Sequence, residues 1–136
     1  MRRIALMLAC LTAPAAGAAD GLPQGAYRVA VHIALPHVET RDFDFETEIC
    51  WRGAADPEMP LGSLGPGPLA GCPAQARDTA EGVAVTNTCP GPNAGFAAAS
   101  YRRTAEGFTG RVEINLGGKN MTMAEFQRGT RTGECE

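Results

Sequence analysis

The residues of this chain best suited to covalent chemistry are its cysteines. Cys10 lies in an apolar N-terminal run, and Cys50, Cys72, Cys89 and Cys135 follow it. An even number of cysteines in a short chain that begins with an export signal is typical of a disulfide framework formed in an oxidising compartment. The four later cysteines therefore predict two disulfides and a location outside the cytoplasm.

Nucleophilic catalysis has little support in the sequence. After residue 19 the chain has two serines, Ser63 and Ser100, and its two histidines, His32 and His37, lie in one short segment. Neither serine stands in a nucleophile elbow or a triad-like motif. We therefore expect a protein that is not an enzyme, and we predict no cofactor.

Two groups of residues have the chemistry of metal ligands. Oxygen and imidazole ligands gather at His32, His37, Glu39, Asp42, Asp44, Glu46 and Glu48. The two histidines are five positions apart, so on one strand they point to opposite faces, and we interpret the segment as a solvated acidic strand face with His32 beside Glu46. Thioethers of Met59, Met121 and Met123 would suit Cu(I), but we expect Met121 and Met123 to pack in the core. No metal site is predicted from either group.

The N-terminus has the three parts of a secretory signal. Arg2 and Arg3 precede an apolar segment, residues 4–11, and small residues follow up to a cleavage point after Ala18 or Ala19. Acylation of Cys10 as a lipoprotein is the alternative, but it would leave an apolar core of about six residues where about 7 to 15 are usual. We predict a signal peptide at 1–19 and a single periplasmic or secreted domain at 20–136.

The charge of the mature chain excludes some partners. Without Arg2 and Arg3, ten basic residues remain against 15 acidic ones, a net charge of −5. An acidic surface repels phosphate backbones, so we expect no binding to nucleic acid. No apolar run after residue 19 approaches the roughly 20 residues of a membrane-spanning helix, so no transmembrane segment is expected in the mature chain.

Apolar residues recur with a period of two along the rest of the chain, which is typical of half-buried strands. Residues 27–35 and 43–51 alternate in this way, and they should pair around the loop at 36–42. Residues 53–72 are rich in proline and glycine, which predicts one long irregular loop. The sequence favours an all-β fold of six or seven antiparallel strands in a meander, either a small barrel or a strongly curved sheet.

Three tight turns fix the expected strand register. Thr-Ala-Glu-Gly occurs at 79–82 and at 104–107, with glycine available for a positive φ, and Gly117-Gly118 is the third turn. The turn at 104–107 places Tyr101 opposite Gly110, where the ring covers a strand glycine. The turn at Gly117-Gly118 places Ile114 opposite Met121 and Val112 opposite Met123.

The turn at 79–82 also predicts the disulfide pairing. A two-residue loop at its tip places Cys72 opposite Cys89, within the distance that a disulfide spans. A three-residue loop would shift this register by one position. By elimination, the second disulfide joins Cys50 to Cys135.

The chain resembles a family of small secreted proteobacterial proteins catalogued only as a domain of unknown function, number 3617. The matching pieces are Leu-Pro-Gln-Gly-Ala-Tyr-Arg-Val at 22–29, a cysteine at the end of the second strand, the close pair Cys72 and Cys89, Asn-Met-Thr-Met at 120–123 and Gly-Thr-Arg-Thr-Gly-Glu-Cys at 129–135. Members carry a threonine-proline-acidic stretch after the first cysteine, whereas Cys50 is followed by Trp-Arg-Gly and the long loop. The resemblance implies no known activity, cofactor or catalytic residue.

The long loop is the candidate binding element. It carries Met59, Leu61, Leu64 and Leu69 on a backbone that we expect to be too irregular to bury them all. Exposed apolar side chains on a restrained loop often form partner sites, although the loop could instead cap one end of the sheet. The leading hypothesis is a non-catalytic module that binds an envelope protein or an apolar ligand. The alternatives are an inhibitor of an envelope-degrading hydrolase such as lysozyme, whose basic cleft an acidic protein would complement, and a periplasmic metal-handling protein.

Overall fold

The computed structural model describes residues 21–36, 43–118 and 121–136, and within them the chain forms strands and loops without a helix. The predicted signal peptide, Cys10, His37, Glu39 and Asp42 lie outside the described residues. The strands are β1 (Gly25–Ala34), β2 (Phe43–Trp51), β3 (Ala74–Asp78), β4 (Gly82–Thr88), β5 (Phe96–Arg103), β6 (Gly107–Asn115) and β7 (Thr122–Gly133). No helix in this part of the chain is long and apolar enough to cross a membrane.

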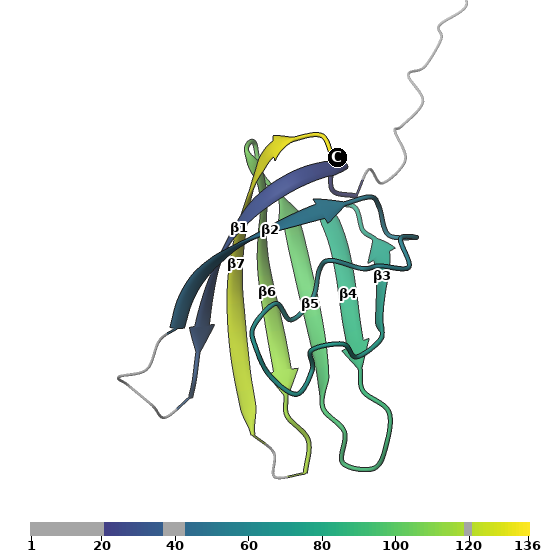
Figure 1. Ribbon diagram of the computed structural model, residues 1–136, viewed down its shortest axis with the longest axis vertical. Coiled ribbons are helices and arrows are strands. Elements are labelled where there is room, and N and C mark those ends of the chain that lie inside the picture. Colours follow the sequence, from purple (N-terminus) through teal and green to yellow (C-terminus); the bar gives the residue numbers. More distant parts are fainter. Residues whose placement is uncertain (1–20, 37–42, 119–120) are drawn as a thin grey trace, which may run out of the picture.

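All seven strands belong to one antiparallel sheet, in the order β2-β1-β7-β6-β5-β4-β3. Strands β3 to β7 form the predicted meander, but β1 pairs with β7, so the first and last strands lie side by side in the middle of the sheet. No pairing joins β2 to β3, so the predicted curved sheet is confirmed and a closed barrel is not formed. Figure 1 shows the sheet coiling, with β1 and β2 running across the view in front of the other strands.

The predicted alternation decides which face of the sheet is buried. On β1, Tyr27, Val29, Val31 and Ile33 are almost fully buried, while Arg28 and Ala30 are exposed. Trp51 at the end of β2 is also in the core, and the inner faces of β4, β5 and β6 add its other strand residues: Val83, Val85, Ala97, Ala99, Tyr101, Phe108, Val112 and Ile114. The core therefore lies on one face of the sheet, which we call the inner face.

The two Thr-Ala-Glu-Gly turns form as predicted. Thr79 and Gly82 exchange backbone hydrogen bonds, and Thr104 N–H donates to the Gly107 carbonyl. The predicted pairing of Tyr101 with Gly110 is confirmed. The expectation that the turns need glycine for a positive φ was wrong, because neither Gly82 nor Gly107 has a positive φ. A Cβ at Gly82 would lie 2.2 Å from the Tyr101 carbonyl oxygen, so close approach of two backbones is what requires glycine there.

The third turn is wider than predicted. Ile114 lies opposite Met123, and Val112 lies opposite Glu125, which is a shift of two residues from the expected register. Met121 is consequently 56% exposed and does not pack in the core. Because side chains alternate along a strand, a shift of two keeps the same face inward. Glu125 therefore still faces inward, and it lies opposite the core residue Val112.

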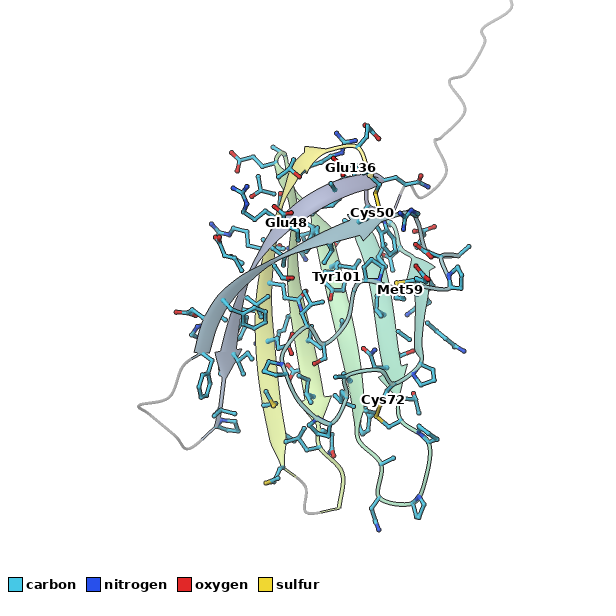
Figure 2. The ribbon with its side chains drawn as sticks, in the orientation of Figure 1. Glu48, Cys50, Met59, Cys72, Tyr101 and Glu136 are labelled. Atoms are coloured by element: carbon cyan, nitrogen blue, oxygen red, sulfur yellow. A yellow bond between two sulfur atoms is a disulfide. The ribbon has the colours of Figure 1, made fainter. Side chains whose placement is uncertain are left out.

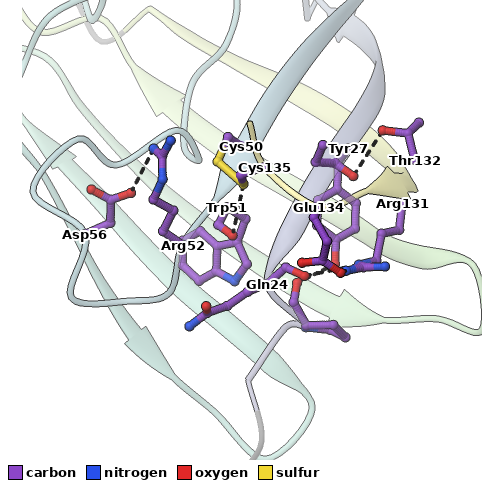
Figure 3. Close-up of a disulfide and its surroundings, with 12 residues drawn as sticks. Gln24, Tyr27, Cys50, Trp51, Arg52, Asp56, Arg131, Thr132, Glu134 and Cys135 are labelled. Atoms are coloured by element: carbon purple, nitrogen blue, oxygen red, sulfur yellow. Dashed lines mark hydrogen bonds and ion pairs between the residues drawn. A yellow bond between two sulfur atoms is a disulfide. The ribbon is translucent and has the colours of Figure 1, made fainter.

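Both predicted disulfides are present. Cys72 and Cys89 are joined with a Cα separation of 4.8 Å, and Cys50 is joined to Cys135 with a separation of 5.5 Å. Next to the second bridge, the indole N–H of the buried Trp51 donates to the Leu22 carbonyl at 3.1 Å. Figure 3 shows this bridge tying the end of the chain to the end of β2.

The long loop, which joins β2 to β3 through residues 52–73, packs on the inner face. Leu61 and Leu69 are buried in the core cluster, and Met59 and Leu64 are half-buried against it. Figure 1 shows the loop running across β4, β5 and β6 before it returns to β3. The loop therefore supplies the second layer of the fold.

Candidate functional site

The inner face of β7 is polar, although every neighbouring strand is apolar there. Glu125 and Gln127 point inward from this central strand and are buried, with 0% and 3% of their surface exposed. Asn87 at the end of β4 is the third buried polar residue among those described. A buried polar group is costly unless it is hydrogen-bonded, so the partners of these three residues show their role.

The carboxylate of Glu125 accepts four hydrogen bonds. Oε1 accepts from Ser63 Oγ at 2.8 Å and from Gly65 N–H at 3.0 Å. Oε2 accepts from Leu64 N–H at 2.9 Å and from Gln127 Nε2 at 2.9 Å. Three of the four donors belong to the long loop, so this side chain holds the loop against the sheet.

The other buried polar side chains hold Gly62 and the backbone of Ser63. Gly62 N–H donates to the Tyr101 hydroxyl at 2.8 Å, and Gln127 Nε2 donates to the Gly62 carbonyl at 2.8 Å. Ser63 N–H donates to Asn87 Oδ1 at 3.4 Å. We call Glu125, Gln127, Tyr101 and Asn87 the clasp, because all four hold the backbone or hydroxyl of residues 62–65.

The clasp affects the pKa of Tyr101 and restricts the type of residue that position 62 can hold. Burial raises the pKa of the Tyr101 hydroxyl far above its ordinary value; the hydrogen bonds with Gly62 and Gln127 oppose this shift and the charge of Glu125 adds to it. Gly62 has a φ of +114°, and a Cβ there would lie 2.3 Å from Asn87 Oδ1. A side chain at position 62 would thus force the loop off the sheet.

Beside the clasp lies a pocket of about 550 Å³, which we call the inner pocket. Its walls come from the long loop and from the ends of β1, β2, β6 and β7 that lie together. The apolar residues that line it are Ile33, Leu35, Phe43, Phe45, Pro66, Pro68, Leu69, Ile114, Leu116 and Met123. Its polar side chains are few: Asp44, Ser63 and Glu125.

The inner pocket has the composition of a site for an apolar ligand. Small-molecule sites are concave and mostly apolar, measure roughly 300 to 1,000 Å³, and contain a few placed polar groups. The acceptor positions of Glu125 are already taken by the loop and by Gln127, which leaves apolar contact as the main source of binding free energy. His32, the one histidine within the described ranges, lies on the outer face, so no described histidine lies beside the Ser63–Glu125 pair.

The structure divides the four loop residues that the sequence singled out. Leu61 and Leu69 are core residues, and Leu69 also lines the inner pocket. Met59 and Leu64 are half-buried, and both line a smaller hollow of about 330 Å³ on the loop. The loop folds back as the alternative reading supposed, but it covers the inner face of the sheet and not one end of it. Contact with a partner stays a prediction.

Glu125 and Gln127 were not singled out from the sequence, although a signal was available. Continuing the period of two from Met123 places both residues on the inner face. A charged residue at an inward position of a central strand requires buried hydrogen-bond donors. Gly65 marks where one such donor is supplied, since a residue without a Cβ allows the backbone to approach the Glu125 carboxylate closely.

On the outer face, the predicted acidic strand is present in a different register. His32 lies opposite Asp44 and not Glu46, with its Nδ1 2.6 Å from Asp44 Oδ1. On the same face, Phe126 of β7 lies opposite His32, and Arg111 of β6 lies opposite Phe126. The Arg111 guanidinium lies 5.1 Å from the Phe126 ring centre. In the part of the chain that the structure describes, no three histidine, cysteine or acidic side chains are grouped as metal ligands.

Comparisons with protein-family models, with curated proteins and with solved structures gave no match. The resemblance to family 3617 therefore stays a prediction from the residues quoted above.

Proposed function

We propose that this protein is a non-catalytic binding module that holds one apolar or amphiphilic small molecule in the inner pocket. The observation that carries the proposal is the pocket itself, an apolar space of about 550 Å³ between the sheet and a loop that the clasp fixes in place. A fixed loop keeps the pocket open without a ligand, which lowers the entropic cost of binding.

Two disulfides agree with an oxidising, exported environment. The further step, to the periplasm or a secreted form, rests on the N-terminal sequence and is part of the proposal. Cell fractionation followed by mass measurement tests it, since export with cleavage after Ala19 gives a mature protein that begins at Asp20. A full-length protein found in the cytoplasm would contradict it.

The binding experiment uses the fluorescence of N-phenyl-1-naphthylamine, an apolar probe, and its displacement by hexanol, octanol and decanol. Each buried methylene contributes about 0.8 kcal/mol, so each should tighten the Kd by about fourfold until the pocket is filled. Met123→Trp adds bulk to a half-buried side chain that lines the inner pocket and should abolish probe binding.

Met59→Trp is the matched control, because Met59 is also half-buried but lies outside the inner pocket. This variant should bind the probe as the unmodified protein does. No fluorescence change with the unmodified protein, or equal binding by Met123→Trp, would overturn the proposal.

A further inference from the structure

Strand β2 forms one edge of the open sheet. Its nine residues pair with β1 on one side, and no described strand pairs with its other side. Such an edge carries backbone N–H and C=O groups that can pair with another extended chain. The opposite edge, β3, is shorter, with five residues.

The inner side of β2 is apolar except for Thr47 and is incompletely covered. Phe43 is 53% exposed, and Phe45 and Ile49 are only half-buried. The inner residues of the neighbouring β1 are almost fully buried, since that strand has a neighbour on each side. An added strand beside β2 would cover these apolar side chains in the same way.

The outer side of β2 is acidic. Asp44, Glu46 and Glu48 alternate along it and are exposed, and Figure 2 shows the Glu48 side chain projecting away from the sheet. Two side chains of β1 contact this row: His32 Nδ1 lies 2.6 Å from Asp44 Oδ1, and the Arg28 guanidinium lies 3.9 Å from Glu48 and compensates part of its charge. A cationic side chain on an added strand would have carboxylates directly across from it, and cross-strand pairs of opposite charge are stabilising.

The same charges select against a second copy of this chain. Antiparallel pairing of two β2 strands would place carboxylates opposite carboxylates, which is destabilising. The edge is thus complementary to a strand of the opposite charge.

We propose that β2 binds an extended segment of a partner protein by strand addition, and that this segment alternates lysine or arginine with apolar residues. Its basic side chains face Asp44, Glu46 and Glu48, and its apolar side chains lie beside Phe43, Phe45 and Ile49. Backbone hydrogen bonds supply affinity, and the alternation of side chains supplies specificity. This site shares Phe43, Asp44 and Phe45 with the lining of the inner pocket, but the added strand pairs with the free backbone edge of β2, whereas a small molecule would occupy the space between the sheet and the long loop.

The test uses a fluorescently labelled nine-residue peptide in which lysine and valine alternate, measured by anisotropy at low salt. Two control peptides replace every lysine by glutamate or the central valine by proline, which removes a backbone donor. The lysine peptide should bind at least tenfold more tightly than either control. Hydrogen exchange of the complex should show new protection confined to amides of β2.

Glu46→Lys should weaken binding of the lysine peptide by about tenfold, because it replaces attraction by repulsion at the middle of the edge. Glu106→Lys changes the net charge equally at an exposed turn position and should alter the Kd less than twofold. Equal binding of the glutamate peptide, protection outside β2, or equal effects of the two variants would overturn the proposal. Self-association through β2, measured by sedimentation, would also overturn it in favour of a second copy.

Discussion

The backbone N–H of Leu64 donates a 2.9 Å hydrogen bond to Glu125 Oε2, although the two residues are 61 positions apart in the chain. This bond joins the long loop to the central strand of the sheet. With the bonds from Ser63 and Gly65, it makes one carboxylate responsible for holding the layer that covers the core.

Glu125→Gln should lower the free energy of unfolding by about 3 kcal/mol, measured by urea denaturation at pH 7. The amide nitrogen would replace an acceptor that receives two donors, so buried N–H groups would lose their partner. Glu113→Gln, on the exposed outer face of β6, is the control and should change stability by less than about 0.5 kcal/mol. A Glu125→Gln variant as stable as the unmodified protein would contradict the role given to this carboxylate.

Gly62→Ala should destabilise the protein by more than about 2 kcal/mol, because the new Cβ would overlap Asn87 Oδ1 and the backbone has a φ of +114°. Gly67→Ala is a control in the same loop. No atom lies within 4 Å of a Cβ at position 67, so that variant should be neutral or slightly stabilising. Equal melting temperatures for the two variants would contradict the role given to residue 62.

The two disulfides should contribute unequally to stability. Replacing Cys50 and Cys135 together by alanine removes a crosslink between residues that are 85 positions apart. Replacing Cys72 and Cys89 removes one between residues that are 17 positions apart. In the loop-entropy model these losses are about 4.5 and about 3 kcal/mol. Urea unfolding of the two double variants should therefore rank the Cys50–Cys135 variant as the less stable. The reverse order would mean that the shorter link has an additional role in the folded state.

Stability should fall as the pH rises above about 10, the ordinary pKa of a tyrosine hydroxyl. Burial raises the pKa of Tyr101, so the unfolded chain releases this proton at a lower pH than the folded protein does. Burial raises the pKa of Tyr27 as well, with Arg131 opposing the shift. The unfolding free energy of Tyr101→Phe should decline less steeply between pH 9.5 and about 11.5. An unchanged slope would show that other groups cause the alkaline loss.

The sequence predicted local pairing well because turn geometry fixes register within a hairpin. The two-residue turns at 79–82 and 104–107 gave the observed partners, including the bridge between Cys72 and Cys89. The turn after Asn115 was placed wrongly, because two consecutive glycines suggest a tight hairpin. In the structure both have positive φ, and Leu116 N–H donates to the carbonyl of Met121 across a wider turn.

Contacts between distant segments could not be predicted in this way. The pairing of β1 with β7 and the docking of residues 62–65 on Glu125 depend on packing that no local pattern records. In an irregular loop, the residue type alone does not show whether a leucine such as Leu61 contacts solvent, a partner or the core. Its position was therefore decided by the three-dimensional arrangement and not by its spacing.

The position of β7 between β1 and β6 has a consequence for a chain that is made from its N-terminus onward. Until residues 122–133 emerge from the ribosome or an export channel, the first hairpin and the four strands that follow have no strand to join them. The last strand to be synthesised is the one that unites both pieces, so a product truncated before it has two additional exposed edges and is prone to aggregate. The complete sheet can therefore form only after β7 has been synthesised.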